Sequence, residues 1–264
     1  MFSDNPNQNN IIELRGISQS YDGGQNWIIQ DLDFLIEDKP DQGQFVVILG
    51  MSGSGKSTLL RYIAGLQKPT KGNVLVKEKE VDNQRVSMVF QQYSSLPWMS
   101  VLDNVALALK FQGVSKKERN DRARELIKLV GLEGHEHKYA QYPTLSGGQL
   151  QRVAIARSLL ANPEILLMDE PFGALDVKTR LTMQDLLTKI WRQFQSTIVF
   201  VTHDISEAVY LADDIYIMKS QPSKVVEHIH VNLPIERNRL TKRDPNYIAL
   251  VHEVEDRMVA VSEL

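Results

Sequence analysis

Short apolar runs separated by helical patterns divide this chain into alternating elements. Phe45 to Leu49 is a continuous apolar run that ends at a glycine, and Ile165 to Met168 and Thr197 to Val201 are two further runs of this kind. Such runs are typical of strands that are buried on both faces of a parallel sheet. Because helical patterns lie between them, we expect a wound, mostly parallel sheet flanked by helices.

The helical patterns begin directly after the first apolar run. Leu59 to Leu66 is predicted to be a helix, Leu102 to Val130 has apolar residues at three- and four-residue spacing, and Ser146 to Leu160 is predicted to be another strong helix. The first of the two long helical stretches is interpreted as a helical insert. Before Phe45, Ile11–Leu14 and Phe34–Ile36 are predicted short strands, with a turn at residues 21–24 between them.

Composition and charge narrow the function classes. The 264 residues are 42% hydrophobic, which is enough for a substantial core, and 30 basic residues against 33 acidic ones give a formal charge of -3. No global basic field indicates nucleic acid, so no nucleic-acid partner is expected. The absence of cysteine excludes disulfides, thiolate metal sites and thiol nucleophiles.

The two ends of the chain carry weaker signals. Residues 1–10 have neither the basic start nor the apolar stretch of a signal peptide, and we expect a disordered leader. No apolar run approaches the roughly 20 residues that a membrane-spanning helix needs. Residues 231–264 are predicted to be a C-terminal tail that contains an amphipathic helix over Tyr247–Val259.

The loop after the first buried strand carries the clearest chemistry. Residues 50–57 read Gly-Met-Ser-Gly-Ser-Gly-Lys-Ser, which fits the phosphate-binding pattern G-x-x-x-x-G-K-[ST] between a strand and a helix. Glycines let successive backbone N–H groups point at phosphate oxygens, Lys56 neutralises phosphate charge, and the Ser57 hydroxyl can bind Mg²⁺. The predicted ATP-binding residues of this loop are Gly50, Met51, Ser52, Gly53, Ser54, Gly55, Lys56, Ser57 and Thr58. The competing interpretation is an ordinary Gly/Ser turn that enters a helix.

Two carboxylates end the predicted strand at Ile165–Met168. Asp169 is predicted to hold the metal, and Glu170 to orient and deprotonate the water that attacks the γ-phosphorus. His203 follows another predicted strand and is expected at the same edge of the sheet, where it could contact the γ-phosphate. Taken alone, the carboxylates also fit a solvated strand end, and a lone histidine is more often structural.

A third motif, Leu145-Ser146-Gly147-Gly148-Gln149, resembles the signature sequence of ATP-binding cassette (ABC) proteins. Physically, Ser146 would cap a helix whose N–H groups and positive dipole end can hold a γ-phosphate, although a plain capped helix has the same features. The resemblance covers roughly Ile11 to Val226. It implies that the signature of one chain contacts the ATP held by a partner chain, so that two ATPase chains enclose two nucleotides.

Further positions are assigned only through this resemblance. Tyr21 is similar to the family's adenine-stacking aromatic residue, and Gln91 to the glutamine that senses metal and attacking water. His203 matches the family's switch histidine, so the implied catalytic set is Glu170, His203 and Gln91, and the implied Mg²⁺ ligands are Ser57, Gln91 and Asp169. The resemblance also implies a dimer-communication loop at Ala174, Leu175 and Asp176.

The segment after Gln91 resembles the ATPases of nitrate, sulfonate and taurine importers. Its Leu96-Pro97-Trp98 element is the main point of likeness, and the resemblance implies that Leu96, Pro97, Trp98 and Met99 contact an integral-membrane permease. An exposed tryptophan and methionine suit such a contact. The alternative is a buried Trp98 that packs against the helical insert.

The resulting hypothesis is an ATPase that energises an ABC importer for nitrate, sulfonate, taurine or a similar small solute. Its implied fold is a P-loop NTPase core with an antiparallel N-terminal β subdomain, residues 11–230, and an ABC-type helical subdomain inserted at about 93–160. The implied partners are a second copy of the same or a similar ATPase chain, a permease and, indirectly, an extracytoplasmic solute-binding protein. The implied location is the cytoplasmic face of the inner membrane, as a peripheral subunit. The alternative is a soluble ABC ATPase with a mechanical or regulatory role.

Overall fold

The computed structural model describes residues 10–39, 42–81, 86–220 and 222–262. The chain forms two compact units, the first made of residues up to Val86 together with those from Val199, and the second of Ser87–Ile198. The predicted leader, apart from residue 10, lies outside the described residues.

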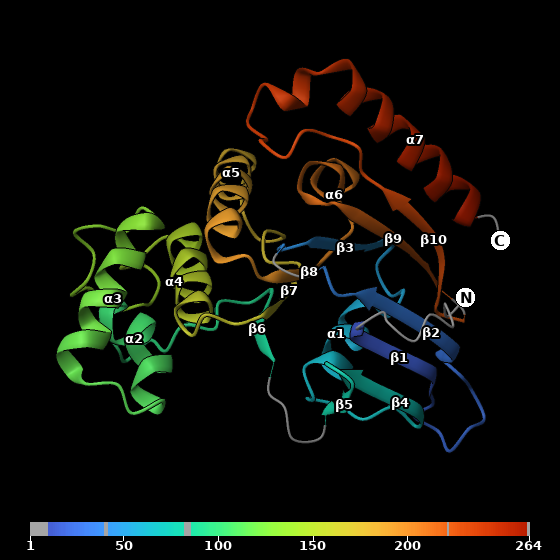
Figure 1. Ribbon diagram of the computed structural model, residues 1–264, viewed down its shortest axis with the longest axis horizontal. Helices are drawn as coiled ribbons and strands as arrows, with labels where there is room; N and C mark the ends of the chain where they lie inside the picture. The colour runs from blue at the N-terminus through green and yellow to red at the C-terminus, as the bar shows by residue number, and fades with distance from the viewer. Residues whose placement is uncertain (1–9, 40–41, 82–85, 221, 263–264) are drawn as a thin grey trace. The chain divides into compact units, whose positions relative to one another are not determined.

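The first unit contains an antiparallel sheet with the strand order β2-β1-β4-β5 (Figure 1). Its strands are β1 (Asn10–Gln19), β2 (Ile29–Glu37), β4 (Lys71–Val76) and β5 (Lys79–Glu80). Leu32, Phe34 and Ile36 of β2 are buried, while Asp33 and Glu37 are exposed, which is the alternation of a sheet with one covered face. The two predicted early strands are therefore confirmed, and both are longer than the sequence indicated.

The main sheet of the first unit has the strand order β10-β9-β3-β8. Strand β3 (Phe45–Gly50) is buried along its whole length and runs parallel to β9 (Asp214–Lys219). Strand β10 (Lys224–His230) pairs with β9 in the antiparallel sense, and β8 spans Thr197–Thr202. The predicted two-face burial of β3 is thus confirmed, because every residue of this strand is buried, and every residue of the predicted strand β8 is buried as well.

Helices complete the first unit. Helix α1 (Lys56–Ile63) follows the loop after β3, α6 (Ile205–Leu211) follows β8, and α7 (Pro245–Ser262) lies beside α6 (Figure 1). The hydroxyl of Tyr247 in α7 donates to the carbonyl oxygen of Ser206 in α6 at 2.9 Å. The predicted tail helix is confirmed, and it begins at Pro245 because proline is well suited to the first position of a helix.

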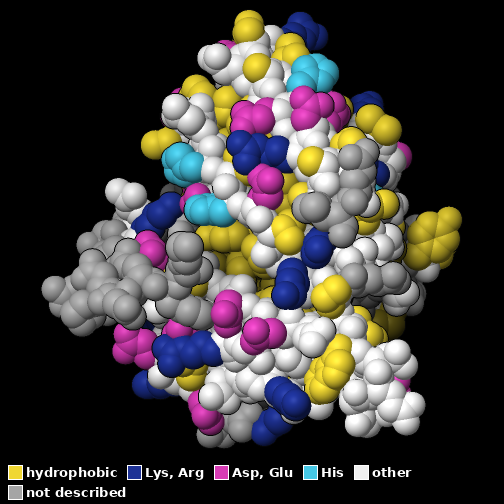
Figure 2. Space-filling view, turned by 90° about the vertical axis from the view of Figure 1, so that its right-hand side faces the viewer, with side chains coloured by type: hydrophobic (Ala, Val, Ile, Leu, Met, Phe, Trp, Pro, Cys, Tyr) yellow, Lys and Arg dark blue, Asp and Glu magenta, His cyan; other side chains and the backbone are white. Residues whose placement is uncertain are grey.

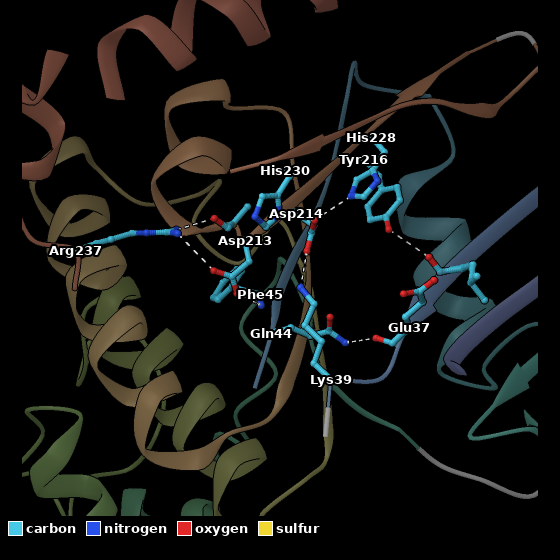
Figure 3. Close-up of polar contacts among 12 residues, drawn as sticks. Glu37, Lys39, Gln44, Phe45, Asp213, Asp214, Tyr216, His228, His230 and Arg237 are labelled. Carbon is cyan, nitrogen blue, oxygen red and sulfur yellow. Dashed lines mark hydrogen bonds and ion pairs between the residues drawn. The ribbon is translucent and has the colours of Figure 1, made fainter. Parts of the chain in front are cut away.

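A cluster of polar side chains joins β9 to β10 and to the segment before α7. The buried Asp214 carboxylate accepts from His228 Nε2 at 2.9 Å, from His230 Nδ1 at 3.1 Å and from Lys39 Nζ at 3.0 Å (Figure 3). Burial alone would raise the pKa of Asp214, but these hydrogen bonds outweigh it and hold the pKa well below its usual value. The adjacent Asp213 has a raised pKa, chiefly because it is buried.

A hollow opens beside this cluster on the face that Figure 2 shows. Its floor is apolar, with histidine, acidic and basic side chains around it. The cavity measures about 470 Å³ and lies between β2 and the β9–β10 pair. The ring of Tyr216 stacks on His228 at a centroid distance of 4.4 Å, and burial raises the pKa of Tyr216 to about 12.

The second unit combines two parallel strands with four helices. Strand β6 (Ser87–Val89) runs parallel to β7 (Ile165–Asp169). The helices are α2 (Val101–Phe111), α3 (Lys116–Leu129), α4 (Gly147–Leu160) and α5 (Val177–Phe194). The side chains of Ser100, Ser115, Ser146 and Asp176 cap them in that order.

The structure refines the predicted helices at two points. The helical stretch Leu102–Val130 contains two helices, because the chain leaves the first at Gln112, passes through Gly113 at φ 77° and begins the second at the Ser115 cap. Helix α1 begins at Lys56 rather than Leu59, since Gly55 in a left-handed conformation ends the phosphate loop there. Within the described residues, no helix combines the length and apolar character needed to cross a membrane.

Candidate functional site

The loop between β3 and α1 has the geometry of a phosphate cradle. Gly55 has φ 90°, and a Cβ on Gly50 would lie only 2.5 Å from the carbonyl oxygen of Met218. These two positions therefore exclude larger residues, one by its backbone conformation and the other by close packing. The hydroxyl of Ser54 is buried in this loop and has no hydrogen-bond partner among the described residues. Such an unsatisfied polar atom fits a loop that is built to receive a polar ligand.

Lys56 supports the same loop from inside. Its ammonium group donates to the carbonyl oxygens of Gly50 and Met51, each at 2.8 Å, and the side chain is buried. A buried cation next to backbone N–H groups at the start of a helix creates a region of positive potential. The sequence-predicted lysine thus lies at the phosphate loop, where two backbone carbonyl groups accept from its ammonium group.

Tyr21 lies in the turn after β1 and is 67% exposed. Its hydroxyl accepts from the Gln67 amide at 3.0 Å, and the turn itself is fixed by the Asp22 carboxylate, which accepts from Ser20 Oγ at 2.7 Å and from Asn26 N at 2.9 Å. These hydrogen bonds lower the pKa of Asp22 to about 2. The ring is therefore both accessible and restrained, which suits a stacking platform.

His203 is exposed directly after β8, the strand that neighbours β3 in the sheet. The turn that follows is fixed by Thr202, whose hydroxyl donates to Glu207 at 2.6 Å and accepts from Asp204 N at 3.0 Å. Ligands of open α/β sheets bind at the ends of such neighbouring strands. His203 thus follows a strand as the sequence predicted, and its contact with the γ-phosphate stays a prediction.

In the second unit, the carboxylate pair ends strand β7. Asp169 is buried, whereas Glu170 has a left-handed backbone with φ 42°. A Cβ on Gly173 would lie 3.4 Å from Gln91 Nε2 and 3.7 Å from Glu170 Oε2, so these two side chains meet at the same glycine. The left-handed backbone of Glu170 is strained for a residue other than glycine, and strained residues of this kind are common at functional sites.

The signature segment forms the start of helix α4. Ser146 Oγ accepts from Gln149 N at 3.3 Å, and Gln149 Oε1 accepts from Ser146 N at 2.9 Å, which together make a capping box. The predicted helix cap at Ser146 is therefore confirmed. A Cβ on Gly147 would collide with the Tyr93 hydroxyl, and one on Gly148 with the Thr179 methyl group. A larger residue at either position would therefore have to displace one of these side chains.

The predicted dimer-communication loop precedes helix α5. Leu175 is buried and Ala174 is exposed, while Asp176 caps the helix by accepting from Thr179 N at 3.0 Å and Thr179 Oγ1 at 2.6 Å. These hydrogen bonds lower the pKa of Asp176. The structural role of Asp176 is plain, and its role between chains stays a prediction.

The segment Leu96–Met99 lies on the surface but is held firmly. The side chain of Asn104 is fully buried, accepts from Leu96 N at 2.8 Å and donates to the carbonyl oxygens of Leu96 and Met99 at 3.0 and 3.2 Å. Trp98 is 70% exposed, so the alternative of a buried tryptophan is wrong. An exposed tryptophan on a fixed loop is typical of a contact surface.

Sequence reasoning missed several residues that support these motifs. Tyr93 touches Gly147, Arg157 donates to Ser94 at 2.7 Å, and His135 contacts the signature glutamine. Arg157 is half-buried within α4, and burial lowers its pKa. The sequence did contain a signal for Arg157, because it is a charged residue on the buried side of a predicted helix. The contacts of Tyr93 and His135 depend on loop conformation and leave no pattern in the sequence.

These features define a nucleotide-binding ATPase cassette, and comparison with known proteins identifies its family. The model of the family described as "ABC transporter" matches residues 36–173. The nitrate import ATP-binding protein NrtD of Synechocystis sp. is 46% identical over 81% of this chain and 83% of its own length. The taurine import ATP-binding protein TauB of Escherichia coli K12 is 41% identical over 92% of this chain and 96% of its own.

A solved structure agrees with these relatives. A dimeric post-hydrolysis form of the ATP-binding cassette MJ0796, bound to ADP and Pi, matches with a TM-score of 0.70 and 33% identity over 84% of this chain and all of that one. The chain therefore belongs to the ABC transporter family and is an ATPase subunit of that family. The alternative of a soluble ATPase with a mechanical role is not favoured, since these relatives are named as import proteins.

Proposed function

We propose that this chain is the ATP-hydrolysing subunit of an importer for nitrate, a sulfonate, taurine or a similar small solute. The observation that carries the proposal is the coverage of the importer relatives, which extends over 92% of the chain in the case of TauB. The exposed and rigid segment Leu96–Met99 supports it, because an ATPase that drives a permease needs a fixed surface on which to push.

In this proposal the chain's own residues divide the chemistry of ATP hydrolysis. The phosphate loop and Lys56 bind the phosphates, Tyr21 stacks on the adenine, Gln91 and Glu170 position the attacking water, and His203 contacts the γ-phosphate. The hydroxyl of Ser57, the amide oxygen of Gln91 and the Asp169 carboxylate are hard oxygen donors of the type that Mg²⁺ prefers. Bound Mg²⁺ would neutralise charge that develops on the β- and γ-phosphates.

The working form is proposed to be a pair of ATPase chains. The capped start of α4, at Ser146–Gln149, presents N–H groups and a positive dipole end that suit the γ-phosphate of the partner chain's nucleotide. The dimeric MJ0796 cassette supports such pairing. We further propose that the pair acts on the cytoplasmic face of the inner membrane, held there by the permease, with a solute-binding protein on the other side.

The Glu170→Gln variant tests the enzymatic part of this proposal. The amide can still accept a hydrogen bond but cannot take the proton of the attacking water, so we expect ATP hydrolysis to fall by about 10² to 10⁴-fold while ATP still binds. Light scattering with ATP and Mg²⁺ is expected to detect a stable dimer. Lys56→Ala is the matched control that loses nucleotide binding, and a Glu170→Gln protein that stays monomeric with bound ATP would contradict the pairing.

The Trp98→Ala variant tests the coupling to a permease. Trp98 is exposed and far in sequence from the phosphate loop, so removal of its ring is expected to leave the ATPase rate of the isolated chain within about twofold. In membranes that contain the permease, solute uptake per ATP hydrolysed is expected to fall strongly, because aromatic residues at such contacts carry much of the binding energy. Phe111→Ala, which removes another exposed aromatic ring of the second unit, is the control. Unchanged permease binding in Trp98→Ala would refute the contact.

A further inference from the structure

The side-chain amide of Gln149 lies between two nitrogen atoms. Its Oε1 accepts from the backbone N–H of Ser146 at 2.9 Å, and its Nε2 lies 2.9 Å from Nε2 of His135. Because a backbone N–H can only donate, the amide atom that faces Ser146 must be the oxygen. The NH₂ group of Gln149 is thereby turned toward His135.

This orientation decides the protonation state that His135 must have. An amide NH₂ group only donates, so Nε2 of His135 has to accept, which requires a neutral ring with its proton on Nδ1. A protonated imidazole carries N–H groups on both nitrogens and would place two donors against each other. If the amide turned over to relieve this contact, its NH₂ group would be set against the N–H of Ser146. The geometry seen here, with the capping box formed and Gln149 in contact with His135, is therefore incompatible with a protonated His135.

The second ring nitrogen of His135 shows that the neutral ring with its proton on Nδ1 is energetically unfavourable in these surroundings. Nδ1 is buried, and within the part of the chain that the structure describes it has no hydrogen-bond partner. In the tautomer that Gln149 requires, this atom carries the proton, and a buried N–H without an acceptor is unfavourable. The capping box thus holds His135 in a state that the ring's own surroundings do not favour.

We propose that neutral His135 is a positioning residue of the signature segment: by accepting from Gln149 it keeps the amide oxygen on Ser146 and so keeps the start of α4 capped. Protonation of His135 releases this cap and loosens Ser146–Gln149. The consequence for ATP-dependent pairing rests on the proposed role of the signature, whereas the effect on the cap does not. Pairing of the ATPase chains therefore weakens as the medium becomes acidic.

The charged groups around His135 have partners of their own. Glu136 interacts electrostatically with His135, and hydrogen bonds, first from its own backbone N–H, hold its pKa below the usual value. His137, the next residue along, is exposed and also interacts with Glu136. The charged residues of the neighbouring helices also have partners: Asp103 of α2 accepts from Ser100, Lys128 of α3 pairs with Glu133, and Arg152 of α4 donates to Val130. Among the described residues, no acceptor contacts Nδ1 of His135.

Hydrogen exchange of the Ser146 amide, followed by NMR in the nucleotide-free protein, measures the cap directly. After correction for the intrinsic pH dependence of exchange, we expect protection of this N–H to fall about fivefold between about pH 8 and about pH 6. His135→Gln offers an acceptor that does not titrate, so its protection should stay high at both values. His135→Lys offers only donors, so its protection should be low at both. His137→Gln is the control and should follow the unmodified chain.

The second readout is ATP-dependent pairing in the Glu170→Gln background. Dimer affinity should fall with acid in the parent and in the His137→Gln control, and should become independent of pH in His135→Gln. If His135→Gln loses Ser146 protection with acid as the parent does, the positioning role is refuted. If exchange behaves as expected but pairing does not change, the positioning role is upheld and the proposed role of the signature in pairing is refuted.

Discussion

Tyr21 is the residue whose role in nucleotide binding the structure makes easiest to isolate. Its ring is exposed, while its hydroxyl is held by Gln67 and its backbone by the turn around Asp22. Tyr21→Ala is expected to raise the Kd for ATP about 3- to 10-fold, which is the usual contribution of one aromatic stacking contact. Titration with a fluorescent ATP analogue measures this change.

The control for Tyr21 separates the ring from the hydroxyl. Tyr21→Phe keeps the aromatic face and loses only the hydrogen bond from Gln67, so its Kd should stay within about twofold of the parent. A similar loss of affinity in both variants would indicate that the hydroxyl, rather than stacking, binds the nucleotide.

Glu170 gives a second prediction at this scale, concerning stability. Its φ of 42° is unfavourable for any residue with a Cβ but not for glycine. Glu170→Gly and Glu170→Ala remove the same carboxylate, and we expect the glycine variant to have a free energy of unfolding about 1 kcal/mol higher than the alanine variant. Urea denaturation of the two proteins measures the difference. An alanine variant that is equally stable would show that the backbone at this position relaxes without cost.

At the scale of elements, the sequence predicted the type of most segments better than their ends. Strands β3 and β7 and helix α4 follow from continuous apolar runs and from a cap, and all three appear in the structure. The break between α2 and α3 was missed because Gly113 and the Ser115 cap lie inside an otherwise helical apolar pattern. Helix α5 was overlooked although Asp176 caps it and Met183, Leu187 and Ile190 are buried at helical spacing.

The residues of the candidate site likewise fall into those that the sequence could predict and those that it could not. Motifs in which neighbouring residues act together, such as the phosphate loop and the signature, could be predicted because their spacing in the sequence is the spacing that their chemistry needs. Contacts between distant segments could not be predicted, since Tyr93 and His135 reach residues 147 and 149 only through the path of two loops. The exposure of Trp98 also required the structure, because a tryptophan is as common in cores as at contacts.

The segment between β10 and α7 depends on a single buried arginine. Arg237 donates to the carbonyl oxygens of Pro234, Tyr210 and Ala212 at 3.1, 3.1 and 2.7 Å, and its guanidinium lies 3.4 Å from Asp213 (Figure 3). Arg237→Ala removes the donor of these hydrogen bonds and the positive charge next to Asp213, so we expect the free energy of unfolding to fall by about 3 kcal/mol.

Urea denaturation of Arg237→Ala tests the role of this segment, with Arg243→Ala as the control. Arg243 is exposed in the 3-10 turn that precedes α7, and its removal should change stability by less than about 0.5 kcal/mol. Equal effects of the two substitutions would mean that the segment after β10 contributes little to the stability of the first unit.

At the scale of the whole molecule, Asp214 links stability to pH. Its three donors hold its pKa below the ordinary value of about 3.9, so in acid the unfolded chain binds a proton at this residue before the folded chain does. The stabilisation by Asp214 is therefore complete above about pH 4 and is lost as the pH falls below that value. Asp214→Asn is expected to lower the free energy of unfolding by about 2 kcal/mol at pH 7, because the donors lose a charged acceptor.

Urea denaturation of the parent and of Asp214→Asn across pH 3 to 7 measures this linkage. The difference between the two proteins should be constant down to about pH 4 and shrink below it, since the unfolded parent then binds a proton at Asp214 that the folded parent does not bind. Asp256→Asn removes an exposed carboxylate from α7 and should leave stability nearly unchanged at every pH. A difference that stays constant down to pH 3 would contradict the assignment of the low pKa to Asp214 and would attribute its contribution to packing of the side chain rather than to its charge.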